Sequence, residues 1–301
     1  LNYNANFTLT TSVSDGVAPP VTGSKAFSTD TPVNDVPTAS GVPADVTVTE
    51  DTASNFDLSA VTVVDVDGDN LTVTLAASAG TFAATSGGSV TVGGSGTLTL
   101  TLQGTATDIN TYLGIVSAIQ YTGALDASGD NAATFTLTAN DGTVDSPVYN
   151  GNIDITPVND APTATNLNTA EPYTEDTPLN LTDIVVSDVD STDVTVTLTL
   201  SNTAAGALST ATSNGVTSTF AAGVWTASGA KADVNTLLAG VTFTPALNFN
   251  ADFTVATSVS DGEAPAVTGS KTFTGTPVND APTATDLNTA EPYTEDTPLN
   301  L

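Results

Sequence analysis

Hydrophobic and polar residues alternate along several short segments of this chain. Residues 194–200 read Val-Thr-Val-Thr-Leu-Thr-Leu, and the same period of two runs through 71–75, 98–102 and 135–137. Alternation of this kind, with β-branched residues on the polar side, is typical of strands that bury one face and expose the other. Turn-forming pairs such as Gly93-Gly94 separate the segments. The pattern predicts an all-β fold of antiparallel β-sandwiches with Greek-key connections.

The sequence Pro-Val-Asn-Asp occurs three times, at 32–35, 157–160 and 277–280. Each copy is followed by Glu-Asp-Thr, and its glutamate always stands 15 residues after the last aspartate of the signature. A long fixed period indicates a tandem array of similar modules. The signatures are 125 and 120 residues apart, and each interval has the usual size of one domain.

These signatures divide the chain into two full modules and two partial ones. We predict the C-terminal part of a preceding repeat at 1–35, full β-sandwich repeats at 36–160 and 161–280, and the N-terminal part of a following repeat at 281–301. We interpret the chain as a piece of a longer array of such modules.

Each full module also contains one segment with helical spacing, at 108–113 and at 233–238. An aspartate opens both segments, and Asp is a favoured helix N-cap. We predict a short helical turn in each module, capped by Asp108 and by Asp233, that fills the core between strands.

The charge of the chain limits its partners. It has 33 acidic residues and only three basic ones, Lys25, Lys231 and Lys271, which gives a net charge of -30. Because so negative a chain repels phosphates and anionic lipids, we predict that neither nucleic acid nor anionic lipid is a partner. No apolar run has the length of a membrane span.

The composition also argues against catalysis. The chain contains no histidine and no cysteine, so a Ser-His-Asp triad, a cysteine nucleophile and an ordinary zinc site are all impossible. Its acidic groups recur at module boundaries and are not gathered in one cleft, which is unlike a catalytic pair of carboxylates. We therefore predict that the protein is not an enzyme.

Acidic motifs recur in both modules in the same order. Asp-x-Asp stands at 65–67 and 188–190, and an Asp-Gly pair follows a strand at 141–142 and 261–262. Together with the linker Asn-Asp and the glutamate of Glu-Asp-Thr, these motifs supply only oxygen donors, which suit Ca²⁺ better than Mg²⁺. Each motif alone is also an ordinary turn former. Their joint recurrence favours calcium binding, and the late aspartate stands 19 residues before the next linker aspartate in both modules.

In this order, the motifs resemble those of the cadherin-like repeat, in the bacterial form found in giant RTX-type surface adhesins. Val158-Asn159-Asp160-Ala161-Pro162 is similar to the cadherin linker. The glutamate, the Asp-x-Asp motif and the late aspartate follow in the family's order along both full modules. One departure is the Asp-Arg-Glu motif of cadherins, in whose place stand Asp126 and Asn248, so the resemblance implies fewer ions per junction.

The resemblance implies that calcium lies between modules. The residues it assigns are Asn34, Asp35, Asp65, Asp67 and Asp141 before the first full module; Glu50, Asn159, Asp160, Asp188, Asp190 and Asp261 between the full modules; and Glu175, Asn279 and Asp280 after the second.

We interpret the chain as calcium-stiffened extender repeats of a bacterial surface adhesin, secreted and extracellular, in which neighbouring repeats of the same chain are the partners. Two alternatives stay open. The sandwich surface itself could bind a sugar, a protein or a partner cell, with Trp225 either an anchor or a core residue. The acidity could instead be an adaptation to a salty medium without a specific ion.

Overall fold

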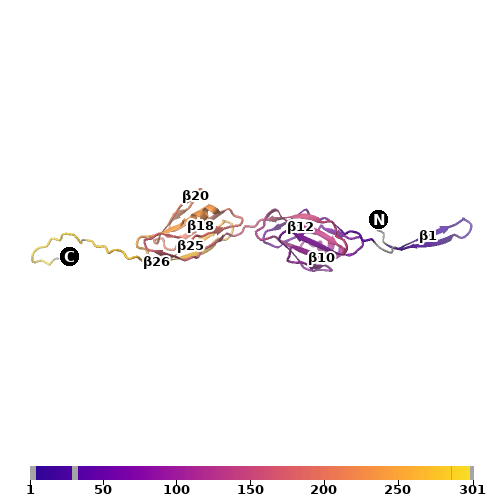
Figure 1. Ribbon diagram of the computed structural model, residues 1–301, viewed down its shortest axis with the longest axis horizontal. Coiled ribbons are helices and arrows are strands. Elements are labelled where there is room, and N and C mark those ends of the chain that lie inside the picture. The colour runs from indigo at the N-terminus through magenta and orange to yellow at the C-terminus, as the bar shows by residue number, and fades with distance from the viewer. Residues whose placement is uncertain (1–4, 29–32, 286, 299–301) are drawn as a thin grey trace. The chain divides into compact units, whose positions relative to one another are not determined.

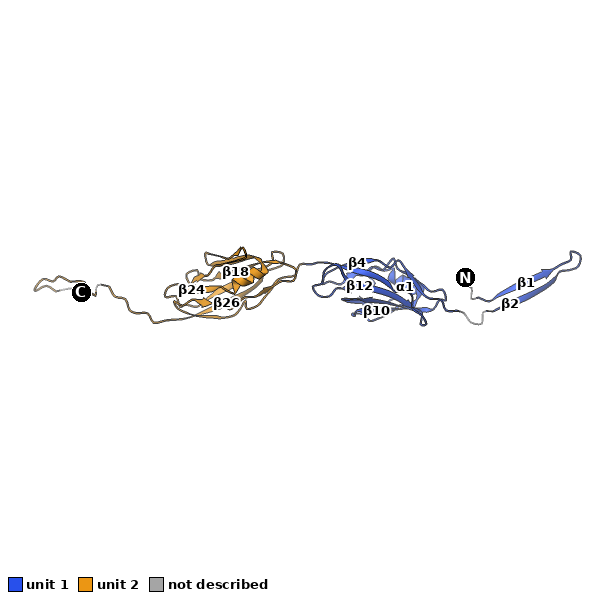
Figure 2. Ribbon diagram, turned by 45° about the horizontal axis from the view of Figure 1, so that its top comes forward, with its two compact units in different colours: residues 1–158 blue, residues 159–301 orange. Residues whose placement is uncertain are grey.

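The computed structural model (Figure 1) describes residues 5–28, 33–285 and 287–298. It divides into two compact units, Leu1–Val158 (unit 1) and Asn159–Leu301 (unit 2), which Figure 2 shows in blue and orange. The division lies two residues before the predicted boundary at 160. Pro32 of the first signature lies outside the described residues. No helix within the described ranges is both long and apolar enough to cross a membrane.

Unit 1 contains a six-stranded sheet, a three-stranded sheet and two two-stranded sheets. Its elements are β1 (Phe7–Val13), β2 (Val21–Phe27), β3 (Thr38–Ser40), β4 (Asp45–Thr49), β5 (Ser54–Asn55), β6 (Thr62–Val64), β7 (Asn70–Ala77), β8 (Thr81–Ala84), β9 (Thr91–Gly93), β10 (Thr99–Thr105), α1 (Ala106–Leu113), β11 (Ile119–Thr122), β12 (Gly129–Asn140) and β13 (Tyr149–Thr156). Six strands form a sheet in the order β4-β13-β12-β7-β10-β9, and β5-β11-β8 form the second. In addition, β1 pairs with β2, and β3 with β6.

Unit 2 repeats this arrangement. Its elements are β14 (Thr163–Ala164), β15 (Glu171–Thr174), β16 (Leu179–Asn180), β17 (Val186–Ser187), β18 (Asp193–Leu200), β19 (Gly206–Leu208), β20 (Thr212–Ser213), β21 (Val216–Thr217), β22 (Thr219–Ala221), β23 (Val224–Ala230), α2 (Lys231–Leu238), β24 (Thr242–Pro245), β25 (Phe253–Ser260) and β26 (Val267–Thr276). The main sheet has the order β15-β26-β25-β18-β23-β22, which matches that of unit 1 strand for strand. The pairing is antiparallel in both main sheets except at one edge, where β4 and β15 run parallel to their neighbours β13 and β26.

The predicted all-β sandwich class is confirmed, and the alternating residues fill the two cores. In β18, Val194, Val196, Leu198 and Leu200 are at most 3% exposed, whereas the threonines between them are more accessible. Leu98 is an exception to the predicted pattern, because it lies in the turn before β10 and is 47% exposed.

Both predicted helices exist, but the prediction of their caps is wrong by three residues. Thr105 is the N-cap of α1: its hydroxyl oxygen accepts from the backbone N–H of Asp108 at 3.2 Å and donates to the Asp108 carboxylate at 2.6 Å. Asp108 therefore stands inside the first turn, where a carboxylate faces the positive end of the helix dipole. In unit 2, α2 follows Ala230, which has no capping side chain, and Asp233 again lies in the first turn.

In both units an aromatic side chain donates a hydrogen bond to the backbone carbonyl that follows the corresponding strand, β8 or β19. The two aromatic residues stand at different positions in the sequence. The Tyr112 hydroxyl donates to the carbonyl of Thr85, directly after β8, at 2.8 Å. The indole N–H of Trp225 donates to the carbonyl of Ser209, directly after β19, at 3.0 Å. Trp225 is fully buried. The interpretation of this tryptophan as a core residue is therefore confirmed, and that of an exposed anchor is wrong.

A buried ion pair distinguishes the core of unit 2. The Nζ of Lys271 on β26 lies 2.7 Å from Oε1 of Glu171 on β15, and the two side chains are 1% and 3% exposed. Lys271 also donates to the carbonyl of Thr182 at 3.1 Å. The registers of β13 with β4 and of β26 with β15 place Val46 and Gly151 at the corresponding positions of unit 1, so the fold itself does not require the pair.

Candidate metal centre

The linker before the first sandwich holds two acidic loops of unit 1 together. The side-chain amide of Asn34 donates to Oδ2 of Asp141 at 2.8 Å. The backbone N–H of the next residue, Asp35, donates to Oδ2 of Asp67 at 2.7 Å. Two motifs that are far apart in sequence are therefore brought to one end of the sandwich by two consecutive residues.

Unit 2 repeats these contacts with its own residues. The amide of Asn159 donates to Oδ2 of Asp261 at 2.8 Å, and the backbone N–H of Asp160 donates to Oδ2 of Asp190 at 2.9 Å. The contacts agree in partner, atom and distance. The linker, the Asp-x-Asp motif and the late aspartate therefore form the same arrangement in both units.

The first aspartate of each Asp-x-Asp motif carries a carboxylate oxygen that lacks a partner. Oδ1 of Asp65 accepts from the backbone N–H of Gly68 at 2.8 Å, and Oδ1 of Asp188 accepts from that of Ser191 at 2.7 Å. Oδ2 of both aspartates is buried and has no hydrogen-bond partner among the described residues. A buried anionic oxygen without a partner is costly unless a cation or water satisfies it.

Hydrogen bonds lower the carboxyl pKa of the late aspartates. For Asp141 the main cause is the backbone N–H of Val144, followed by the amide of Asn34, and the pKa falls below 3.8. For Asp261 the amide of Asn159 is the main cause of a pKa that is likewise lowered. Because these donors favour the ionised form, both carboxylates are charged at neutral pH.

The second acid of the unit 2 motif is affected in the same way. The backbone N–H of Asp160 is the main cause that lowers the pKa of Asp190 below its usual 3.8. The linker therefore keeps both acids that it contacts in unit 2 in their charged form.

At the opposite end of each unit, the glutamate of Glu-Asp-Thr holds the outgoing linker. Oε2 of Glu50 accepts from the backbone N–H of Val158, and Oε2 of Glu175 accepts from that of Val278, both at 2.8 Å. Both glutamates are 3% exposed. Glu50 lies in unit 1, whereas the aspartates assigned to the same junction lie in unit 2, so their sharing of an ion stays a prediction. Asn279 donates to the carbonyl of Asp280 at 3.3 Å.

Sequence reasoning missed acidic residues beside these glutamates. Asp51 has a left-handed backbone, and its Oδ1 accepts from the backbone N–H of Asp126 at 3.3 Å. In unit 2, Oδ1 of Asp176 accepts from the backbone N–H of Asn248 at 2.9 Å. The recurrence of Glu-Asp-Thr was the available signal, since its second acid repeats as faithfully as its first.

Asp69 was also missed. One carboxylate oxygen from each of Asp65, Asp67 and Asp69 lies within 4.8 Å of the others. The residues present fit a hard divalent cation: the donors are oxygens only, three carboxylates of unit 1 converge, and one buried oxygen per unit is unsatisfied.

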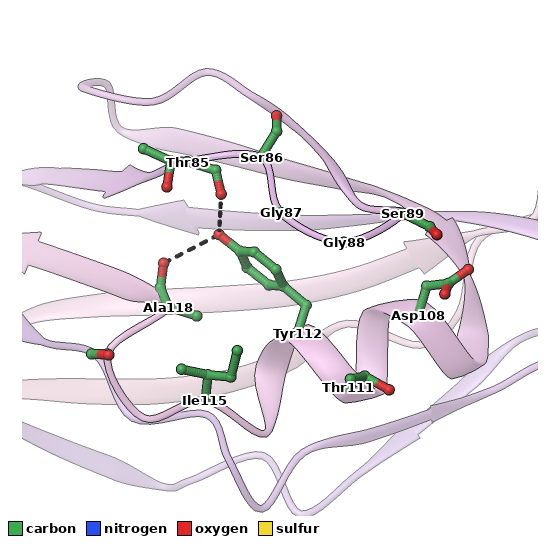
Figure 3. Close-up of a pocket in the computed structure, with 11 residues that line it drawn as sticks. Thr85, Ser86, Gly87, Gly88, Ser89, Asp108, Thr111, Tyr112, Ile115 and Ala118 are labelled. Carbon is green, nitrogen blue, oxygen red and sulfur yellow. Dashed lines mark hydrogen bonds between the residues drawn. The ribbon is translucent and has the colours of Figure 1, made fainter.

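A separate pocket of unit 1 opens beside α1 (Figure 3). It has a volume of about 370 Å³ and is lined by Thr85, Ser86, Gly87, Gly88, Ser89, Asp108, Thr111, Tyr112, Ile115, Ser117 and Ala118. The Tyr112 hydroxyl is within hydrogen-bond distance of the carbonyls of Thr85 and Ala118, at 2.8 and 3.2 Å, and so links two of its walls. In unit 2 the β20–β21 hairpin contacts the matching helix instead, where Ser213 and Asn214 donate to Asp233.

Comparison with known proteins gives fold likeness only. No protein-family model and no curated protein matches this chain. Extracellular cadherin domains 1–5 of protocadherin gamma B2 are similar at 12% identity and a TM-score of 0.40, covering 92% of this chain and 47% of that one. Human mucin-like protocadherin EC1-2 is 13% identical with a TM-score of 0.38, over 80% of this chain and 99% of that one.

Titin domains Z1Z2 in complex with telethonin are 9% identical with a TM-score of 0.27, over 82% of this chain and 100% of that one. This chain spans about half the length of the protocadherin gamma B2 structure. At such identities and TM-scores these structures establish no family, and the β-sandwich fold rests on the strands described above.

Proposed function

We propose that the chain is a structural extender, made of cadherin-like repeats that calcium cross-braces at each junction. In this proposal it belongs to the extracellular stalk of a large bacterial surface adhesin, and it has no catalytic role. The observation that carries the proposal is the repeated arrangement of linker and acidic loops, which in both units leaves a buried aspartate oxygen without a partner.

The proposed ligands are the residues that the cadherin resemblance implies. Asp65, Asp67 and Asp141 hold the ion in unit 1, together with Asn34 and Asp35 of the linker. Asp188, Asp190 and Asp261 do so in unit 2, together with Asn159 and Asp160. When bound, calcium supplies a charge of two and a flexible shell of six to eight oxygens.

In this proposal, the preceding repeat completes the site of unit 2. Glu50 already fixes the last residue of unit 1 through the backbone N–H of Val158. Its carboxylate is the proposed contribution of unit 1 to the ion of unit 2, and Glu175 plays the same part for the repeat that follows. Ion binding in which two repeats share ligands converts binding free energy into junction stiffness.

Small-angle X-ray scattering tests this role. The full chain is measured with millimolar CaCl₂ and with chelator, at constant ionic strength. We expect a narrower range of inter-unit geometries with calcium, seen as a sharper pair-distance distribution. Asp188→Asn should remove the difference, whereas Asp183→Asn, an exposed control in the same unit, should keep it. Identical profiles in calcium and chelator would contradict the proposal and leave salt adaptation as the explanation of the acidity.

A second candidate function, direct binding of a neutral sugar, is favoured by the pocket beside α1. Its volume suits a small ligand. Its hydroxyls and the Asp108 carboxylate can bond to sugar hydroxyls, and no basic residue stands between Lys25 and Lys231 to attract an anion. Methyl glycosides of glucose and galactose are titrated by NMR. Shifts at Gly87 and Gly88 that Asp108→Asn abolishes support this function, and unchanged spectra contradict it.

A further inference from the structure

Lys231 attaches itself to the acidic loop of unit 2 by three hydrogen bonds. Its Nζ donates to the carbonyl of Asp188 and, at 2.9 Å, to that of Ser191. Its backbone N–H donates to the carbonyl of Thr192 at 2.9 Å. One residue therefore contacts three carbonyls along the loop that carries Asp188 and Asp190.

The position of this lysine is unfavourable for the helix to which it belongs. Lys231 is the first residue of α2, where its positive charge stands at the positive end of the helix dipole. The helix also lacks a side-chain cap at Ala230. The ammonium group takes its hydrogen-bond partners from the loop and none from the helix. We therefore infer that Lys231 serves the loop and not the helix.

Unit 1 differs at this position. The first residue of α1 is Ala106, and the sequence contains no basic residue between Lys25 and Lys231. The loop that corresponds to 188–192 carries a third carboxylate, Asp69, where unit 2 has Thr192. Unit 1 therefore concentrates three acids in its loop without a side-chain cation, whereas unit 2 has two acids and one ammonium group.

We propose that Lys231 is a built-in cation that orders the 188–192 loop before any divalent ion binds. Backbone carbonyls are ligands that calcium itself takes, and the ammonium group of Lys231 bonds to two of them. The 65–69 loop must instead be ordered by the divalent ion. This second half rests on the proposed calcium binding, while the first half is independent of it. The two sites are then unequal: calcium orders a loop in unit 1 but fills a prepared site in unit 2.

Amide hydrogen exchange of the full chain tests both halves. In chelator at constant ionic strength, we expect protection factors for 188–192 to exceed those for 65–69 by about tenfold. Lys231→Met keeps the apolar stem and removes the charge, so it should abolish this excess. Lys25→Met changes the net charge equally but lies on β2, and it should leave the excess intact. Added calcium should then raise protection more in 65–69 than in 188–192.

Each outcome decides one half. Unchanged protection of 188–192 in Lys231→Met overturns the role of the lysine. Global unfolding of unit 2 in that variant, seen as a red shift of Trp225 emission, overturns it too, because the proposal confines the effect to the loop. If calcium protects neither loop, the proposed function fails, yet the measurements in chelator still decide the role of Lys231.

Discussion

The ion pair of Lys271 and Glu171 allows a quantitative test of how much a buried charge in unit 2 depends on its partner. Replacing Lys271 by Met keeps most of the side-chain volume but leaves the carboxylate of Glu171 in a core where it is 3% exposed. The carboxylate keeps its hydrogen bonds from the backbone N–H and the hydroxyl of Thr182, at 2.9 and 3.3 Å. It loses the only ion pair formed in the described part of the chain, at 2.7 Å.

The expected cost is large because a charge would be left buried without its partner. Removing one member of a buried ion pair typically costs about 3–5 kcal/mol. With a urea m-value of about 2 kcal/mol/M, the midpoint of unfolding should fall by roughly 1.5–2.5 M. Unit 1 has Val46 and Gly151 at these positions, so the combined variant Glu171→Val with Lys271→Met should recover most of the loss.

Trp225 makes the assay specific for unit 2. It is the single tryptophan of the chain and is fully buried in that unit. Urea unfolding followed by tryptophan emission therefore reports on unit 2 alone, and the double-mutant cycle gives the coupling between the two residues. A midpoint shift below about 0.5 M in Lys271→Met, equivalent to roughly 1 kcal/mol, would refute the reasoning. So would a double variant that is as unstable as the single one.

Three further predictions concern single contacts. In an NMR titration, the carboxyl of Asp261 should show a pKa below 3.8 that rises in Asn159→Ala, the variant that loses the largest lowering cause. Since the folded pKa is depressed, the stability it confers is complete above pH 3.8 and is lost as the pH falls through the lower folded value. Tyr112→Phe should destabilise unit 1 by about 1 kcal/mol, because the carbonyl of Thr85 loses its donor, and calorimetry measures the change. Gly151→Ala should lower the melting temperature of unit 1, because the new methyl group would overlap the ring of Phe135; an unchanged value would contradict the packing described.

Much of the fold could be predicted because its signals are local or periodic. The alternation in residues such as Val194 and Val196 follows directly from the pleat of a strand. The parallel edge strand β15 could not be predicted, since four residues of alternating burial fit either direction. The helix caps were predicted wrongly because Asp is a favoured N-cap residue, so Asp108 was taken as the cap of α1. In the structure the helix begins three residues earlier, and Thr105 is its N-cap.

The candidate site, too, has residues that the sequence could predict and residues that it could not. The Asp-x-Asp and late Asp-Gly motifs recur in the same order in both modules, so the sequence pointed to their aspartates, and the structure brings Asp67 and Asp141 to consecutive linker residues. The lysine at 231 carried no comparable signal, because it occurs in one unit only and its carbonyl partners have no sequence signature. Contacts to backbone carbonyls depend on the path of the chain and become visible only in the folded structure.

Calcium titration by isothermal calorimetry tests the central claim most directly. At constant ionic strength, the wild-type chain should bind Ca²⁺ saturably in the micromolar to millimolar range and Mg²⁺ much more weakly. Asp65→Asn combined with Asp188→Asn, which alters the two buried oxygens that lack partners, should abolish most of the heat, whereas the exposed control Asp130→Asn should not. Absence of saturable binding, or an isotherm unchanged by the double substitution, would contradict the account.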